Sequence, residues 1–128
     1  MNDKKVETEY VYLKLTNGIV HVIFKSNLNI KLDIAQKIVN SRLELIDGKS
    51  YPTLVDGRNV ISMDKETRDC FVSEKGREGV KAAAVLTGSV FNRFLSNFFL
   101  KVSFVKSYFP TRLFTDEAKA IEWLEQFK

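Results

Sequence analysis

The stretch Tyr51-Pro-Thr-Leu-Val-Asp-Gly-Arg-Asn-Val60 decides the fold, because it joins a short strand signal to a polar turn. The run from Tyr51 to Val55 ends in two residues that favour strands. Asp56-Gly57 breaks that run, and Arg58 and Asn59 follow where the chain turns. Because helical patterns lie on both sides, we predict the central strand of an α/β sheet with a polar loop at its C-terminal tip.

Length and composition predict one globular domain. The chain has 128 residues, of which 45% are hydrophobic and 28% are charged, so it can bury a core and does not have the composition of a disordered chain. One cysteine, Cys70, excludes an internal disulfide and fits a reducing compartment. Met1–Glu7 lacks the apolar core of a signal peptide, and no apolar run is long enough to span a membrane. We therefore expect a cytoplasmic protein.

The formal net charge of +4 is unevenly distributed. No acidic side chain occurs between Gly79 and Thr115, where all the charged residues are basic. This segment could face a partner of negative charge, or it could be the basic side of a soluble protein. The basic residues are Lys81, Arg93, Lys101, Lys106 and Arg112.

The first part of the chain predicts a hairpin. Residues 1–9 are mostly charged and are expected to be flexible. Two β-rich runs, Tyr10–Leu15 and Ile19–Phe24, flank Asn17-Gly18, whose residues tolerate the positive φ of a tight turn. The second run is apolar on both faces and belongs inside a sheet, whereas the first is better suited to an edge.

A βαβ unit should follow the hairpin. Apolar residues at three- and four-residue spacings predict a helix over Leu32–Ile46, ended by Gly48, and the Tyr51–Val55 strand comes next. Asp64 is the expected N-cap of a second helix, from Lys65 to about Gly76.

The rest of the chain continues the alternation. A third parallel strand is predicted at Lys81–Thr87, where three alanines suggest close packing, and Gly88-Ser89 opens another helical segment that Pro110 stops. A short strand at Arg112–Phe114 precedes a helix over Asp116–Phe127, capped by Thr115. The predicted fold class is α/β: a mixed sheet of about five strands, with an N-terminal hairpin, βαβ units and about four helices, in one domain over residues 10–128.

This order of elements resembles the STAS fold, and more closely the SpoIIAA-like group of small bacterial proteins. The resemblance depends on Tyr51-Pro-Thr-Leu-Val-Asp-Gly-Arg58, on the alanine-rich strand 82–87, and on the ending Pro110-Thr-Arg-Leu-Phe-Thr-Asp-Glu-Ala-Lys-Ala-Ile-Glu-Trp-Leu124. It covers nearly all of the chain after Tyr10. What it implies is a fold, and a fold does not by itself fix a function.

The resemblance also points to a place where this sequence departs from its relatives. In anti-sigma-factor antagonists, a serine that opens the second helix is phosphorylated. The matching stretch here is Asp64-Lys65-Glu66-Thr67, with Lys65 in place of that serine; Ser62 and Thr67 are nearby hydroxyls at other positions. The resemblance therefore implies a relative that has the fold without that serine switch.

The best candidate for a ligand site is the C-terminal edge of the parallel strands, where open α/β sheets bind ligands. The loops that follow the predicted strands 51–55 and 81–87 should meet there. The free N–H groups at the start of the helix after the second loop could bind an anion, and Arg58 could add further donors. Alternatively, Gly88 only makes a turn, Ser89 caps the helix, and Asp56 or Arg58 pairs with a neighbour. The candidate residues are Asp56, Arg58, Thr87, Gly88 and Ser89.

The segment Ser89–Phe109 has a wider apolar arc than one sheet contact requires. It could be a deeply packed helix, the interface of a symmetric homodimer, or a contact with lipid, since basic residues border its aromatics. The residues singled out for a dimer or lipid face are Phe91, Phe94, Phe98, Phe99 and Phe104.

Catalytic and metal chemistry find little support in the sequence. His21 is the only histidine and lies mid-strand, where a structural or surface role is expected, and Cys70 is expected to be a small buried hydrophobe. One His and one Cys cannot make an ordinary zinc site, and no nucleotide-binding fingerprint occurs. We expect neither a cofactor nor binding to nucleic acid, because the charge is small and no RNA-binding motif is present.

The sequence therefore favours a non-catalytic binding or regulatory module that acts through protein contacts, as a homodimer, without the serine switch. The alternative is a carrier or sensor of a small anionic or lipid-like ligand. An enzyme is the third choice.

Overall fold

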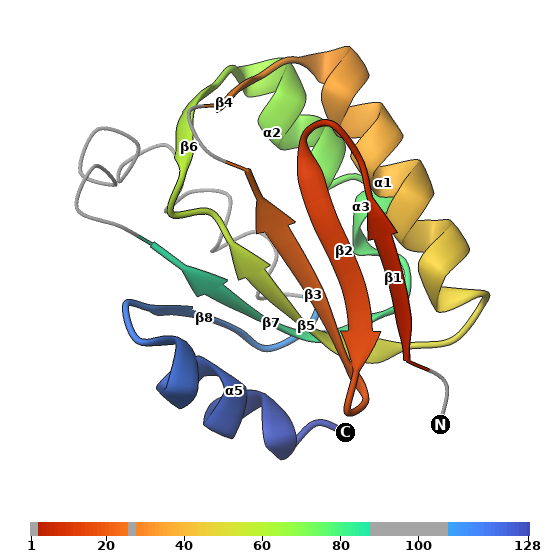
Figure 1. Ribbon diagram of the computed structural model, residues 1–128, viewed down its shortest axis with the longest axis vertical. Coiled ribbons are helices and arrows are strands. Elements are labelled where there is room, and N and C mark those ends of the chain that lie inside the picture. Colours follow the sequence, from red (N-terminus) through yellow and green to blue (C-terminus); the bar gives the residue numbers. More distant parts are fainter. Residues whose placement is uncertain (1–2, 26–27, 88–107) are drawn as a thin grey trace.

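The computed structural model describes residues 3–25, 28–87 and 108–128 (Figure 1). Its main sheet has six strands in the order β1-β2-β3-β5-β7-β8, and β4 and β6 form a separate two-stranded sheet. The strands are β1 Lys4–Glu7, β2 Val11–Thr16, β3 Ile19–Phe24, β4 Leu28–Ile30, β5 Tyr51–Asp56, β6 Val60–Met63, β7 Val80–Leu86 and β8 Thr111–Phe114. The helices in the described part of the chain are α1 Leu32–Ile46, α2 Lys65–Phe71, α3 Glu74–Arg77 and α5 Glu117–Glu125.

The N-terminal hairpin is confirmed, but it is not the edge of the sheet. Asn17 and Gly18 take φ values of 52° and 73°, which lets β2 and β3 pair directly on either side of them. The prediction of flexibility over residues 1–9 is wrong for Lys4–Glu7, which forms β1 and pairs antiparallel with the outer side of β2. The charged composition of this segment is that of an edge strand exposed to solvent.

The predicted central strand lies inside the sheet. β5 pairs in parallel with β3 on one side and with β7 on the other, and β8 continues the parallel series beyond β7. The helix that connects β3 to β5 has the predicted bounds, and positive φ at both Asp47 and Gly48 ends it. The mixed α/β fold class is therefore confirmed, with six strands in the main sheet in place of about five.

Two helix boundaries differ from the prediction. The second helix is interrupted after Phe71, because Ser73 accepts a hydrogen bond from Gly76 N–H and so begins a separate turn, α3. The last helix is capped by Asp116, which accepts from Lys119 N–H, so Thr115 is not its cap. In both cases the residue with the stronger acceptor at the right spacing takes the cap position.

β4 and β6 form a small parallel ladder that the sequence did not predict. Each follows a strand of the main sheet, β4 after β3 and β6 after β5. Because β3 and β5 are neighbours in the main sheet, the segments that follow them also come to lie next to each other and pair. Its three- and four-residue strands are too short to show a hydrophobic period.

Two hydrophobic cores lie on opposite faces of the main sheet. Helices α1 and α2 pack together on one face, and α5 covers the other over β5, β7 and β8 (Figure 1). The alanines of β7 are fully buried at Ala82 and Ala84, where Ala120 of α5 joins them, which confirms the predicted close packing. The core on the α1 side of the sheet contains Val11, Leu13, Val22, Phe24, Ile38 and Leu45 among others.

Candidate functional site

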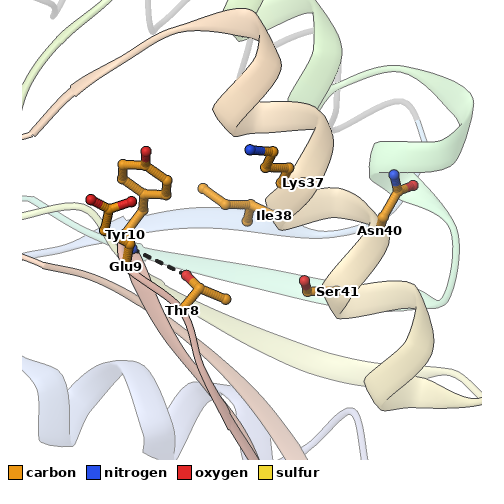
Figure 2. Close-up of a pocket in the computed structure, with 7 residues that line it drawn as sticks. All are labelled: Thr8, Glu9, Tyr10, Lys37, Ile38, Asn40 and Ser41. Carbon is orange, nitrogen blue, oxygen red and sulfur yellow. Dashed lines mark hydrogen bonds between the residues drawn. The ribbon is translucent and has the colours of Figure 1, made fainter.

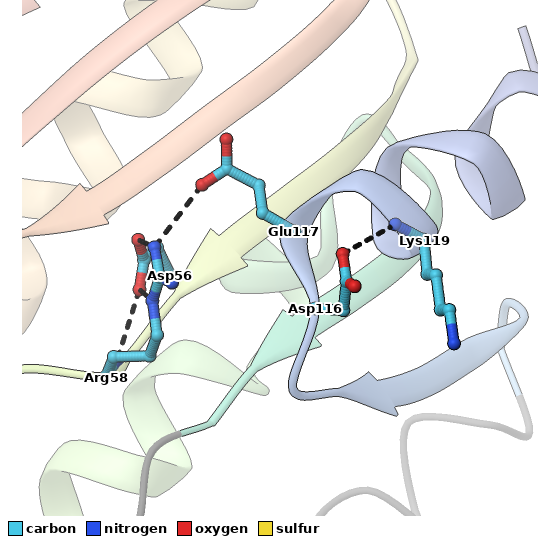
Figure 3. A network of polar contacts seen from close by, with 5 residues as sticks. All are labelled: Asp56, Arg58, Asp116, Glu117 and Lys119. Atoms are coloured by element: carbon cyan, nitrogen blue, oxygen red, sulfur yellow. Dashed lines mark hydrogen bonds and ion pairs between the residues drawn. The ribbon is translucent and has the colours of Figure 1, made fainter.

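The predicted ligand edge contains a tightly paired aspartate and arginine. Asp56 ends β5 and is 6% exposed, and the Arg58 side chain forks onto it, with Nε 2.9 Å from Oδ1 and Nη2 2.7 Å from Oδ2 (Figure 3). The Arg58 backbone N–H also donates to Asp56 Oδ1 at 3.2 Å. Asp56 is therefore satisfied by one residue two positions further along the chain.

A second carboxylate reaches the same arginine from the start of α5. Glu117 Oε1 lies 3.3 Å from Arg58 Nη2 (Figure 3). The hydrogen bonding of Arg58 to the Asp56 carboxylate, which accepts from it, raises the pKa of Arg58, and Glu117 acts in the same direction. The guanidinium is thus compensated by two acidic groups, which makes it a weaker attraction for an anion than a free arginine.

In the part of this edge that the structure describes, the strand topology does not build a crevice. Ligand clefts of open α/β sheets occur where the strand order reverses, so that helices diverge to opposite faces. Here β3, β5, β7 and β8 follow one another in a single direction, and α1 and α2 lie on the same face. Gly57 N–H donates to Leu86 O at 3.1 Å, and Thr87 N–H donates to Phe114 O at 3.0 Å, so neighbouring strand ends bond to one another.

The structure therefore brings together three of the five predicted loop residues. Asp56 and Arg58 form the ion pair, and Thr87 follows Leu86, the ladder partner of Asp56. Gly88 and Ser89 lie outside the described residues, as do the five phenylalanines Phe91, Phe94, Phe98, Phe99 and Phe104.

The start of α2, where the resemblance to anti-sigma-factor antagonists pointed to a phosphorylated serine, is a closed cap in this protein. Asp64 Oδ1 accepts from Thr67 N–H at 2.9 Å and from the Thr67 hydroxyl at 2.6 Å. These bonds lower the pKa of Asp64. Thr67 is fully buried, so its hydroxyl is both occupied and shielded, whereas Lys65 has a 78% exposed side chain paired with Asp69 at 2.9 Å.

Exposed side chains lie on β6 of the small sheet and on the first turn of α2. Ile61 is 46% exposed, and the exposed Ser62 hydroxyl donates to Asn29 Oδ1 across the β4–β6 ladder. We call Ile61, Ser62 and Lys65 the β6–α2 surface. It combines an exposed aliphatic side chain, a hydroxyl and a lysine on consecutive elements.

Sequence reasoning missed Arg42, a buried cation in α1. It is 5% exposed, and its Nη2 donates to the carbonyls of Lys75 and Gly76, each at 3.1 Å, while Nη1 has no hydrogen-bond partner among the described residues. Burial lowers the pKa of Arg42. A signal was available, because Arg42 lies four residues after Ile38 in the apolar stripe of the helix.

His21 and Cys70 are placed as structural residues. His21 is 7% exposed within β3, and burial lowers its pKa, with the Lys14 charge acting in the same direction. Cys70 is half-buried, and burial raises the pKa of its thiol. Over residues 3–25, 28–87 and 108–128, no cluster of three or more His, Cys, Asp or Glu side chains has the arrangement of a metal site.

A groove of about 440 Å³ lies between the β1–β2 turn and α1 (Figure 2). Thr8, Glu9 and Tyr10 form one wall, and the hydrogen bond and charge of Glu9 raise the pKa of Tyr10. The opposite wall is formed by α1, with the buried Ile38 among its exposed and half-buried polar residues. It consists of Lys37, Ile38, Asn40 and Ser41.

Residues 13–128 match DUF7793, a domain of unknown function. The chain belongs to this family. None of the curated proteins matches the sequence. Among the helices of this DUF7793 domain that the structure describes, none combines the length and apolar character needed to cross a membrane.

Two solved structures are similar to this DUF7793 chain. An uncharacterized protein of the DUF3478 family from Shewanella loihica PV-4, which has a SpoIIAA-like fold, is 13% identical, with a TM-score of 0.55 over 96% of this chain and 92% of that one. A protein of unknown function from Arthrobacter sp. FB24 is 26% identical over 94% and 97% of the two chains, with a TM-score of 0.35. The first likeness shows that the DUF7793 domain has a SpoIIAA-like fold.

Proposed function

We propose that this protein is a non-catalytic binding or regulatory module of the SpoIIAA-like type, which acts through protein contacts in the cytoplasm without a serine phospho-switch. The start of α2 is the observation that carries the proposal. By the resemblance to anti-sigma-factor antagonists, Lys65 stands where their phosphorylated serine is expected. The nearest buried hydroxyl, that of Thr67, donates to Asp64 at 2.6 Å.

The chemistry of this cap favours constant rather than switched binding. A phosphate adds charge that can order or repel a partner, and it needs an accessible hydroxyl. The Thr67 hydroxyl is fully buried, and Lys65 presents a positive charge whether or not a kinase acts. A partner that binds the β6–α2 surface would meet the same surface at all times.

The β6–α2 surface supplies the contacts that such a partner needs. Ile61 offers apolar area. The cationic end of Lys65 already pairs with Asp69, but its side chain is 78% exposed, so an acidic group of a partner could still approach it. The compensated Arg58 supports this proposal over the alternative of an anion carrier, because Asp56 and Glu117 accept from its Nε and Nη2 groups and offset its charge.

Capture of partners from cells that make the tagged protein tests this proposal, with an Ile61→Asp variant and a Tyr12→Asp control. Tyr12 is 47% exposed, close to the 46% of Ile61, but lies on β2, so the pair separates a local contact from a general effect of surface charge. We expect a partner that the wild type and the Tyr12 variant retain and the Ile61 variant loses. The interaction should then be reproduced with both purified proteins.

The absence of a phospho-switch is checked separately on the same purified protein. Intact-mass measurement should show no phosphate, and replacing Ser62 with alanine should leave partner binding unchanged. Phosphate on Ser62 that alters binding would contradict the proposal, as would partner binding that survives the change at Ile61.

A further inference from the structure

The outer edge of β1 carries a pattern that is complementary to itself. All four residues of this strand, Lys4-Lys-Val-Glu7, are exposed, and Val6 is one of the exposed large hydrophobics at 38%. Among the described residues, β1 is the first strand of the sheet order, and its only strand neighbour is β2 on the inner side. An edge strand of this kind can accept another strand.

The ladder fixes which backbone groups of β1 face outward. Thr8 N–H donates to Val11 O at 2.9 Å, so the backbone groups of Thr8 point toward β2. Alternate residues along an antiparallel strand point the same way, so Lys4 and Val6 also face β2. The N–H and C=O groups of Lys5 and Glu7 therefore point away from the sheet.

A two-fold axis perpendicular to the sheet would place a second β1 antiparallel to the first, with equivalent faces on the same side. Residues opposite one another must then point to the same face. On β1, Val6 lies opposite Leu13, a residue of the α1-side core, so Lys4 and Val6 share that face while Lys5 and Glu7 share the other. Allowed partners thus differ by an even number of positions.

Within the strand Lys4–Glu7, only one such register satisfies both the hydrogen bonds and the charges, although beyond the strand it also sets Asp3 against Glu9 of the second copy. Centred on Val6, it sets Val6 against Val6 and Lys5 against Glu7 of the second copy, twice by symmetry. Those two pairs use the outward N–H and C=O groups just identified, which gives four backbone hydrogen bonds. Each pair also joins opposite charges across the strands, which is favourable in a sheet.

The neighbouring registers are opposed by like charges. Centring on Lys5 sets Lys5 against Lys5 and Asp3 against Glu7, and centring on Glu7 sets Glu7 against itself. In the Val6 register, Lys4 of the second copy lies opposite Thr8, at the groove wall that contains the exposed carboxylate of Glu9 (Figure 2). That carboxylate adds a further acidic group near an incoming lysine.

We propose that β1 is a homodimer interface, in which two copies pair through this edge in the Val6 register and form one continuous sheet of twelve strands. The interface is separate from the β6–α2 surface and does not depend on the proposed function. It also differs from a dimer through the phenylalanine-rich segment. Because the contact involves a short strand, we expect a dissociation constant of roughly micromolar order.

Charge exchange tests this interface by sedimentation velocity. Lys5→Glu sets two glutamates against two glutamates, and Glu7→Lys sets lysines against lysines, so each variant alone should dimerise roughly tenfold more weakly or worse. A 1:1 mixture of the two variants should regain the dimer, because each strand then faces the opposite charge. The double variant K5E/E7K should also regain it.

Matched controls keep the result specific. Lys119→Glu makes the same charge change on an exposed residue of α5 and should leave the dimer intact. Glu7→Lys also removes the exposed Glu7–Lys25 ion pair of 2.7 Å, whereas Lys5→Glu does not, and circular dichroism checks that both remain folded. A wild-type monomer at about 100 µM would overturn the proposal, and so would a dimer unaffected by either variant or a mixture that stays monomeric.

Discussion

At the scale of single residues, Asp56 and Arg58 show how far the sequence could anticipate the site. Their pairing was one of the alternatives for the polar loop, because two residues of separation allow a side chain to reach back across a turn. The contribution of Glu117 could not be predicted, since it lies 59 residues away and reaches Arg58 only through the packing of α5. The donors of Arg58 are consequently less available than the sequence suggested.

His21 gives a prediction about pH. Its pKa in the folded protein is lowered, by burial first and by Lys14 second, whereas the unfolded chain has the ordinary value of 6.5. The unfolded state therefore binds more protons as the pH falls below 6.5, so stability is complete above that value and is lost toward acid. One histidine can contribute a slope of at most about 1.4 kcal/mol per pH unit.

Urea unfolding at a series of pH values between neutral and mildly acidic checks this. Wild type should lose stability faster than a His21→Leu variant, which has no titrating group at that position. Carboxylates titrate in both proteins, so the difference between the two curves isolates the histidine. Parallel curves would show that His21 is protonated equally in the folded and unfolded states.

At the scale of elements, periodic segments were predicted well and short polar ones were not. The helix α1 was predicted with its observed bounds, because fifteen residues show a clear apolar spacing and a glycine follows. β4 and β6 are too short to carry a period, and β1 has the composition of a solvated tail. The existence of these strands depends on the backbone edge of a neighbour, which no local pattern encodes.

The contact between α1 and α3 gives a prediction at this scale. Arg42 of α1 links the two helices, because its guanidinium donates to the carbonyls of Lys75 and Gly76 in α3. Replacing it with methionine keeps much of the volume but leaves both carbonyls without this donor. We expect a loss of about 1–3 kcal/mol in the free energy of unfolding.

Lys37 provides the matched control on the same helix. It is exposed, so Lys37→Met should change the free energy of unfolding by less than about 0.5 kcal/mol. Denaturant unfolding of the two variants and wild type makes the comparison. Equal stabilities for the Arg42 and Lys37 variants would mean that the buried guanidinium contributes no net stability, as can happen when its desolvation offsets its hydrogen bonds.

At the scale of the whole molecule, the direction of the strand order matters more than the presence of a carboxyl edge. The sequence correctly indicated parallel strands that end in polar loops, but it could not show whether the order reverses. In the observed sheet the order does not reverse, so the connecting helices α1 and α2 cover the same face. Helix α5, which follows the last strand, covers the other face. Ligands of open α/β sheets bind in the crevice between helices that diverge to opposite faces, and the described part of this edge has no such crevice.

The same topology predicts how the protein responds to a small anion. Because Asp56 and Glu117 compensate Arg58, phosphate should raise the melting temperature of the wild type no more than chloride does at equal ionic strength. An Asp56→Asn variant removes the closer carboxylate and frees donors of the guanidinium, so phosphate should stabilise this variant by roughly 2–4 °C relative to chloride. Differential scanning fluorimetry measures both proteins in both salts. Stabilisation of the wild type by phosphate that disappears in Arg58→Met would instead restore an anion site at this edge, because it would show that Arg58 retains donors for a ligand despite its two acidic neighbours.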